Sequence, residues 1–268
     1  MIPYCFHTHT KRCGHAIGED EEYVIEAIAA GVRRLGFSDH VMIPGFSQPG
    51  IRGDYSEVEG YLNSMNSLKN KYKDKLKMYV GFEAEYSDLF EDYYRSLFEE
   101  NKIDYLILGQ HFNFSNGKIT DYFGHVHEKS SMLKYRDHVV KAMSTGLFSV
   151  FAHPDVFLSS YSKFDSTAKA VTVDICKASL QYDVPLEINL AGIRKGIVTV
   201  GNEKRYLYPY RPFWEVVAKY KCRVVIGVDA HDPRDFKSNE YSIALQMIRE
   251  LGLNHDQQLK LKEYKNNW

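Results

Sequence analysis

Residues 223–231 read Arg-Val-Val-Ile-Gly-Val-Asp-Ala-His, so a run of apolar residues leads directly into Asp229 and His231. Such a run is typical of a short buried strand, and the two polar residues then stand at its carboxyl end. The same kind of run recurs along the chain. Runs that predict strands lie at residues 2–6, 34–37, 77–82, 105–108, 148–152, 185–189 and 223–228.

A helix-like segment follows each predicted strand. The first begins near Asp20, which suits an N-cap, and places Tyr23, Val24, Ala27 and Ile28 on one apolar stripe. The other segments that predict helices lie at residues 55–72, 88–100, 129–144, 168–182, 211–220 and 239–251. Regular alternation of strands and helices predicts parallel strands with crossover helices, in either a doubly wound sheet or a closed barrel.

The positions of the polar residues favour the barrel. Six of the seven predicted strands carry a side chain that can bind a metal at or just beyond the carboxyl end. A barrel brings these ends to a single rim, where barrel enzymes place their sites, whereas an open sheet spreads them along a line. We therefore expect an α/β fold with a closed or nearly closed seven-stranded barrel, formed as a single domain by residues 1–268.

The rim has the composition of a metal centre. His7 and His9 alternate along an extended segment, so both imidazoles point the same way and can reach one ion. Glu83 and Asp229 each follow an apolar run, where a basic partner, a helix cap or a metal ion would offset the cost of burial. Seven of the eleven histidines closely follow predicted strands: His7, His9, His15, His40, His111, His153 and His231. Nine candidate ligands exceed what one ion needs, so we expect two or three divalent ions.

Composition and charge exclude several classes of protein. The 268 residues are 44% hydrophobic and 26% charged, which suits a globular core. The 34 basic and 35 acidic residues nearly cancel, which argues against a dedicated nucleic-acid binder. No run approaches the roughly 18 consecutive apolar residues of a membrane span, so no membrane partner is expected. Four scattered cysteines without a C-x-x-C pair fit a reducing compartment, and the cytoplasm is the expected location.

The order of the candidate ligands, from His7-x-His9 to Asp229-x-His231, resembles the polymerase-and-histidinol-phosphatase (PHP) superfamily over residues 6–232. The resemblance implies a metal-dependent phosphoesterase with a distorted seven-stranded (β/α)7 TIM-like barrel. Within the superfamily, Cys13-Gly14-His15-Ala16, Glu22-Tyr23-Val24 and residues 36–40 are similar to the histidinol-phosphatase type. Hydrolysis of L-histidinol phosphate to L-histidinol and phosphate, in histidine biosynthesis, is then the expected activity.

The resemblance also implies how the ligands are shared among zinc, manganese or iron ions. One ion is held by His7, His9, Glu83 and Asp229, a second by Glu83, His111 and His153, and a third by His15, His40 and His231. Two ions about 3.5–4 Å apart lower the pKa of a shared water, which then attacks phosphorus as hydroxide. Glu83, Asp229 and His231 are therefore the expected catalytic residues.

The sequence offers further polar residues near the rim. Arg194, after the sixth strand, is the first candidate to bind the substrate phosphate and Arg211 the second, although both can equally be solvated loop charges. Asp39 and Asp155 can orient ligand imidazoles or cap helices. The long loop at residues 113–128 contains His125 and His127 and can cover the site as a lid, but the favoured interpretation is that both histidines are surface residues.

Three functions stay open at this point. The first is a phosphomonoesterase that acts on a small molecule, histidinol phosphate. The second is a PHP-type phosphoesterase that acts on nucleotides or single-stranded nucleic acid, which the neutral charge disfavours. The third is a regulatory or structural metal-binding module without turnover. Carboxylates among so many ligands disfavour the third, because structural zinc sites are usually four-coordinate and closed.

Overall fold

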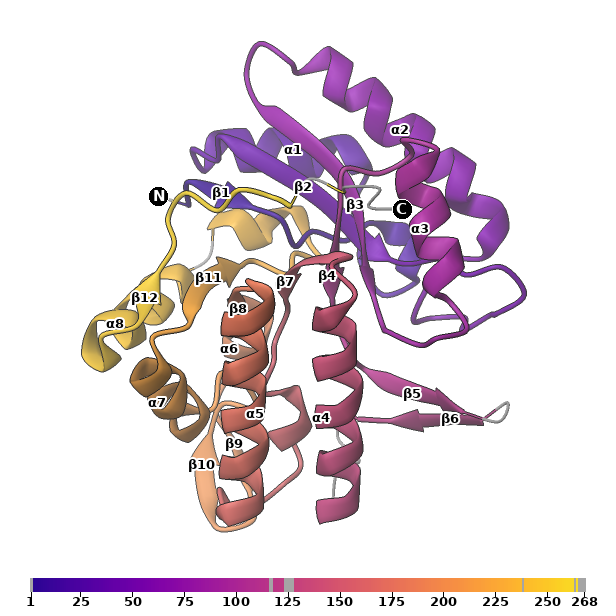
Figure 1. Ribbon diagram of the computed structural model, residues 1–268. Helices are drawn as coiled ribbons and strands as arrows, with labels where there is room; N and C mark the ends of the chain where they lie inside the picture. The colour runs from indigo at the N-terminus through magenta and orange to yellow at the C-terminus, as the bar shows by residue number, and fades with distance from the viewer. Residues whose placement is uncertain (1, 116–117, 123–127, 238, 263, 265–268) are drawn as a thin grey trace.

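One curled sheet forms the centre of the molecule, and helices cover its outer face (Figure 1). The computed structural model describes residues 2–115, 118–122, 128–237, 239–262 and 264. The sheet has eight parallel strands in the order β1-β2-β3-β4-β7-β8-β11-β12. Their bounds are β1 Tyr4–Cys5, β2 Arg34–His40, β3 Lys77–Ala84, β4 Tyr105–Leu108, β7 Phe148–Phe151, β8 Leu186–Asn189, β11 Arg223–Gly227 and β12 Asn254–His255.

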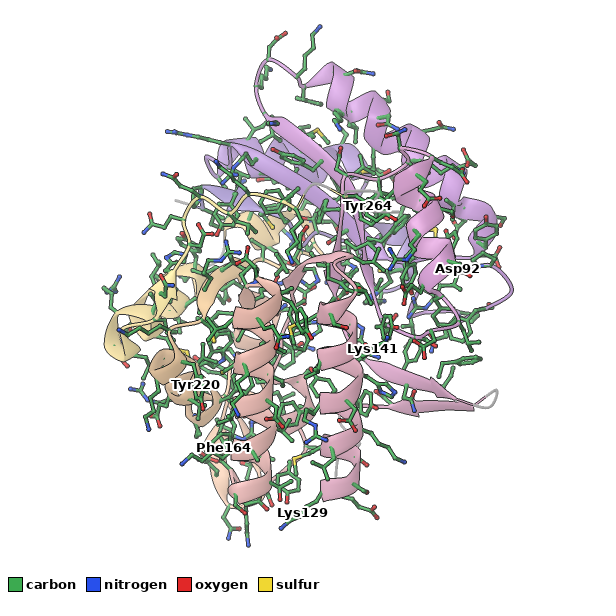
Figure 2. The ribbon with its side chains drawn as sticks, in the orientation of Figure 1. Asp92, Lys129, Lys141, Phe164, Tyr220 and Tyr264 are labelled. Carbon is green, nitrogen blue, oxygen red and sulfur yellow. The ribbon has the colours of Figure 1, made fainter. Side chains whose placement is uncertain are left out.

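Except for the short helix Leu190–Arg194, which the sequence did not predict, the helices lie close to where the sequence predicts them, after successive strands. Their bounds are α1 Asp20–Ala29, α2 Val58–Lys71, α3 Glu91–Glu99, α4 Lys129–Ser144, α5 Ser166–Tyr182, α6 Leu190–Arg194, α7 Arg211–Tyr220 and α8 Glu240–Leu251. Side chains fill the space between the helices and the sheet (Figure 2). Among the residues described, no helix is both long and apolar enough to cross a membrane.

The start of α1 differs from the prediction by one residue. Glu19 is the N-cap, because Glu19 and Glu22 form a capping box around the first turn. Asp20 is the first helical residue. Its carboxylate instead accepts hydrogen bonds from Arg12 Nη1 at 2.8 Å and from the Ser64 hydroxyl at 2.6 Å. The Asp20 carboxylate, which the sequence assigned to the N-cap, therefore forms an ion pair with Arg12 instead.

The chain beyond β1 meets the chain beyond β11 at one point, so the curled sheet forms a nearly closed barrel, as predicted. Beyond β1 and β11, Thr8 and Ala230 form a parallel bridge, with His9 N donating to Ala230 O at 2.9 Å. At the opposite end of the barrel, β12 pairs with β11 as an eighth strand. The sequence did not indicate β12, because two residues are too few to show a strand period. The sheet therefore has eight strands, one more than the seven expected.

The interior of the barrel is a packed core below the polar rim. Inward-facing side chains form one buried cluster: Tyr4, Phe6, Tyr105, Ile107, Val150, Ala152, Val225 and Leu259. The Tyr105 hydroxyl donates to the Phe6 carbonyl at 2.8 Å, which satisfies its polar atom inside the core. Apolar side chains thus fill the middle of the barrel and leave polar chemistry to its carboxyl end.

Two hairpins leave the barrel where the sequence suggested loops. Strands β5 (Phe112–Ser115) and β6 (Lys118–Asp121) form an antiparallel pair that projects from the barrel (Figure 1). Phe112 and Phe114 of this hairpin pack on Phe46, so part of the expected lid is regular structure. His125 and His127 lie outside the described residues. The second hairpin consists of β9 (Val198–Val200) and β10 (Glu203–Arg205).

Candidate metal centre

The structure brings all nine candidate ligands together at the carboxyl end of the barrel. Eight of them, all except His7, line a pocket of about 290 Å³. The nine candidate ligands are His7 and His9 after β1, His15 after the 3-10 helix η1 (Lys11–Cys13), His40 in β2, Glu83 in β3, His111 after β4, His153 after β7, and Asp229 and His231 after β11. Parallel strands explain the convergence, because their carboxyl ends share one rim.

Glu83 lies at the centre of the cluster and faces ligands on two sides. Its Oε2 atom is 3.5, 3.5 and 3.2 Å from ring nitrogens of His7, His9 and His40, and its Oε1 atom is 2.9 and 3.4 Å from those of His153 and His111. Burial alone would raise the pKa of Glu83, but the surrounding imidazoles hold it well below its usual range. A carboxylate with one oxygen toward each group of nitrogens is suited to bridge two cations.

Asp229 forms a second focus of contacts. Its Oδ1 atom is 3.5 Å from His7 Nε2, 3.2 Å from His9 Nε2 and 3.2 Å from His231 Nδ1. The backbone of Asp229 has a φ of 50°, and that of His153 a φ of 30°. Non-glycine residues rarely adopt this left-handed region, and such strain clusters at functional sites. The fold therefore holds these two residues in strained backbone conformations, which cost free energy.

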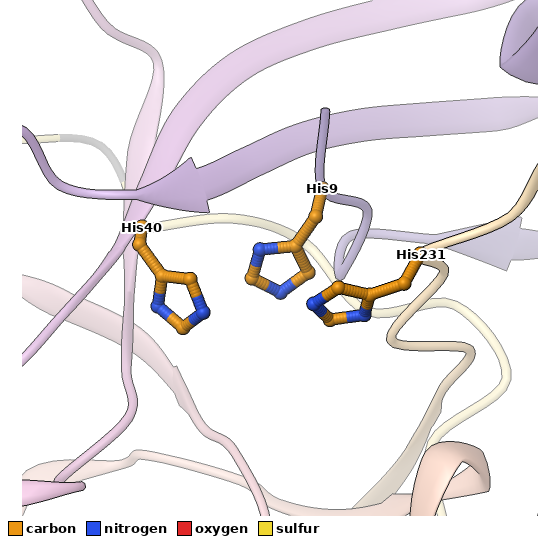
Figure 3. Close-up of side chains that lie close together, drawn as sticks. All are labelled: His9, His40 and His231. Atoms are coloured by element: carbon orange, nitrogen blue, oxygen red, sulfur yellow. The ribbon is translucent and has the colours of Figure 1, made fainter. Parts of the chain in front are cut away.

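Two pairs of ring nitrogens in the cluster lie so close together that each pair could bind one shared cation. His7 Nε2 and His9 Nε2 are 3.1 Å apart, and His15 Nε2 and His231 Nε2 are 2.9 Å apart. Figure 3 shows the rings of His9, His40 and His231 gathered around one space. Among the residues described, four buried atoms of the cluster have no hydrogen-bond partner: His9 Nδ1, His40 Nδ1, His153 Nδ1 and Asp229 Oδ1. Buried polar atoms without partners are costly, and this mixed nitrogen and oxygen donor set fits divalent metal ions.

The same contacts move the imidazole pKa values in two directions. Burial lowers the pKa of His7 and His9, but facing carboxylates outweigh it, so His7 lies well above its ordinary value and His9 rises to about 9. His40 and His15 have lowered pKa values, because burial and the neighbouring imidazoles of His9 and His231 disfavour their charged forms. Protons and metal ions compete for these nitrogens, so metal binding depends on pH.

Two buried residues behind His7 were not assigned a role from the sequence. His7 Nδ1 lies 3.0 Å from both carboxylate oxygens of Glu187, in β8. The Asn189 amide donates to Glu187 Oε1 at 2.9 Å and to Asp229 Oδ2 at 3.0 Å. A carboxylate on Nδ1 directs Nε2 toward the other candidate ligands and fixes the ring orientation. The available signal was the pair Glu187 and Asn189, two polar residues on one face of an otherwise apolar strand.

A second carboxylate holds His111. Glu85 is buried, and its Oε1 atom lies 2.9 Å from His111 Nδ1. Arg52 donates from Nη2 to both oxygens of Glu85 at 2.9 Å, and its side chain is fully buried. Burial would raise the pKa of Glu85, but Arg52 and His111 lower it below the ordinary value. The pair keeps a charged acceptor behind His111, which orients its Nε2 atom toward Glu83.

Two glycines make room for the buried carboxylates. A Cβ atom on Gly109 would overlap the carboxyl group of Glu83, and one on Gly227 would overlap that of Glu187. Neither glycine has a positive φ, so the requirement is close approach rather than backbone conformation. A larger residue at either position would displace a carboxylate from the cluster.

The two aspartates with alternative roles differ. Asp39 Oδ1 lies 3.5 Å from His9 Nδ1, so this carboxylate sits against a ligand imidazole, as one alternative held. Asp155 turns away from the cluster. Its Oδ2 atom accepts hydrogen bonds from Tyr210 N at 2.6 Å and Trp214 Nε1 at 3.1 Å, at the start of α7. Burial raises the pKa of Asp155 to about 6.

The predicted phosphate-binding arginines do not line the pocket. Arg194 Nη2 donates to the carbonyls of Val228 and Asp229 at 2.8 and 2.6 Å, so it holds the turn that carries the candidate ligand Asp229. Arg211 is half exposed and pairs with Glu250 at 2.8 Å. The cationic side chain among the lining residues is Lys195, next to Arg194. The other lining residues outside the ligand set are Gly50, Ile51, Asp121, Val156 and Tyr208.

Comparison with known proteins identifies the family. A "Probable histidinol-phosphatase" of Deinococcus radiodurans is 25% identical over 258 residues, which cover 92% of each chain. A solved structure from Listeria monocytogenes superposes with a TM-score of 0.73 at 20% identity, over 89% of this chain and 99% of that one. The histidinol phosphate phosphatase of Lactococcus lactis, solved with zinc, L-histidinol and phosphate, gives a TM-score of 0.69 at 18% identity, over 95% of each chain. Residues 6–191 match the model of the PHP domain, and this chain belongs to the PHP domain family.

Proposed function

We propose that this chain is a histidinol-phosphatase, which hydrolyses L-histidinol phosphate to L-histidinol and phosphate in histidine biosynthesis. The observation that carries the proposal is the ring of imidazole and carboxylate ligands around a pocket of about 290 Å³, a volume suited to a small molecule. The name of the Deinococcus relative and the ligands of the Lactococcus structure support the substrate. The net charge of −1 gives no support to binding of a nucleic-acid strand.

The proposed cofactors are two or three zinc, manganese or iron ions. His7, His9, Glu83 and Asp229 would hold one ion, Glu83, His111 and His153 a second, and His15, His40 and His231 a third. Divalent ions supply Lewis acidity that activates water and neutralises phosphate charge. Glu83 would contribute its carboxylate to both the first and the second ion. Asp229 and His231 line the pocket and complete the proposed catalytic set.

Lys195 is proposed to bind the substrate phosphate in place of Arg194 or Arg211. Its Nζ atom donates to the Tyr208 hydroxyl at 2.9 Å, and both side chains line the pocket. Burial lowers the pKa of Lys195, but Asp229 opposes this shift and favours the ammonium form. Arg194 acts in this proposal by holding the carbonyls on either side of Asp229, which positions that carboxylate.

The proposal is tested by phosphate release from three kinds of substrate: histidinol phosphate, nucleoside monophosphates and single-stranded DNA. The chain is loaded in turn with zinc, manganese and iron, and Asp229→Asn serves as the inactive control. We expect histidinol phosphate to be the preferred substrate. Comparable turnover of every phosphoester would contradict the assignment, and metal binding without any turnover would indicate a regulatory or structural module.

The phosphate contact is tested by three matched variants. A charge-assisted hydrogen bond contributes about 1.5–3 kcal/mol, so Lys195→Met should lower kcat/KM about 10- to 100-fold, mainly through KM. Arg211→Met should leave both constants unchanged. If Arg194→Met raises KM and Lys195→Met does not, the phosphate contact belongs to Arg194.

A further inference from the structure

Cys13 lies inside the ligand cluster but has no role in the function proposed above. The residue is fully buried, and its sulfur lies within 4.8 Å of one ring nitrogen of His15 and one of His231. The Nε2 atoms of these two imidazoles are 2.9 Å apart. One sulfur and two nitrogens therefore surround a small volume at the exposed side of the pocket.

The surroundings of Cys13 provide a second, independent observation. Its sulfur also lies within 4.8 Å of a ring nitrogen of His9 and of a carboxylate oxygen of Asp39. Among the residues described, the Nδ1 atom of the fully buried His9 has no hydrogen-bond partner. The turn depends on Gly14, which has a φ of 82° and packs so tightly on Gly50 that a Cβ atom would lie 2.9 Å from its Cα.

The thiolate, rather than the thiol, is the form that binds metals. A cation between Cys13, His15 and His231 would therefore be held by one charged sulfur and two neutral ring nitrogens.

We propose that Cys13 is a further ligand of the ion held by His15 and His231. As the ion binds, the sulfhydryl proton passes to solvent and the sulfur donates a lone pair to the metal. Thiolate ligands are soft and favour zinc, iron or cobalt over manganese. The inference rests on the metal centre of the proposed function, and it predicts that this position retains zinc in preference to manganese.

Cobalt provides a test that needs no substrate. The chain is stripped with a chelator, loaded with cobalt(II), and its absorption is recorded for wild type, Cys13→Ser and Cys222→Ser. Cys222 is the control, because it is also a buried free cysteine but contacts the Cys176 carbonyl instead of the cluster. We expect a sulfur-to-cobalt charge-transfer band in wild type and Cys222→Ser, and its loss in Cys13→Ser. A wild-type spectrum without this band, or a band that persists in Cys13→Ser, overturns the proposal.

Metal competition separates ligation from a structural effect of the substitution. Loss of a partner outside the coordination sphere weakens metal binding about 10- to 100-fold, so loss of a ligand should weaken one zinc position by at least about tenfold. Manganese binding at that position should change little. Equal weakening of zinc and manganese in Cys13→Ser means that the residue only shapes the turn, and this outcome also overturns the proposal. Both readouts are independent of turnover, so a failure to hydrolyse histidinol phosphate is distinguishable from either result.

Discussion

Replacement of Glu187 by glutamine tests whether the carboxylate behind His7 sets the affinity of the metal centre. In the structure, Oε1 accepts from Asn189 and lies 3.0 Å from His7 Nδ1, and Oε2 lies at the same distance from that nitrogen. Glutamine keeps one acceptor oxygen but loses the negative charge and turns an N–H group toward His7. Partners of this kind contribute about 10- to 100-fold in metal affinity, or about 1.4–2.7 kcal/mol.

The assay is a titration of the metal-free chain with zinc against a competing chelator, combined with elemental analysis. We expect Glu187→Gln to weaken binding of the ion proposed at His7 and to leave binding of the ion proposed at His111 unchanged. Glu85→Gln should do the reverse, because Glu85 contacts His111. Glu59→Gln, at an exposed position on α2, is the neutral control. The reasoning is refuted if Glu187→Gln binds every ion with wild-type affinity, or if Glu187→Gln and Glu85→Gln lose the same ion.

Three further predictions concern protons, space and stability. Metal affinity should keep rising between pH 7 and 9, because the pKa of His9 is about 9 and protons compete below it; chelator titrations that level off above pH 6.5 would contradict this. Gly109→Ala should fold, as judged by circular dichroism, but should lose bound metal in elemental analysis because its Cβ atom overlaps Glu83. Asp155 has a folded pKa of about 6 against 3.8 unfolded, so its contribution to stability is present below pH 3.8 and is lost as pH rises through 6. Asp155→Asn should remove this loss of about 3 kcal/mol, and identical pH dependence of denaturant unfolding in both proteins would count against it.

Local pattern accounts for much of the fold. The helix predicted at residues 129–144 is α4, Lys129–Ser144, because periodic apolar residues define a long amphipathic helix well. The strand β12 and the helix α6 span two and five residues, and tertiary packing rather than propensity stabilises such short elements. The hairpin β5–β6 likewise depends on aromatic packing against Phe46, which lies more than 60 residues earlier in the chain.

The sequence likewise predicts one part of the site and not the other. Most of the candidate ligands could be named because they stand at or just beyond the end of an apolar run, and parallel strands bring those ends together. Glu187 acts on His7, 180 residues away, so no local spacing marks the pair. The direction of a side chain after a strand is also absent from the sequence. Arg194 and Lys195 are adjacent, yet one donates to backbone carbonyls and the other lines the pocket.

The bridge between Thr8 and Ala230 places part of the cluster on the seam of the barrel. Ligands from the first strand leave the ribosome long before Asp229 and His231, which lie more than 200 residues later in the chain. A nascent chain that lacks β11 therefore carries an open sheet with only part of its donor set. The protein is expected to acquire its full complement of ions only after residues 229–231 have been synthesised, and a fragment that ends before residue 223 should not hold them.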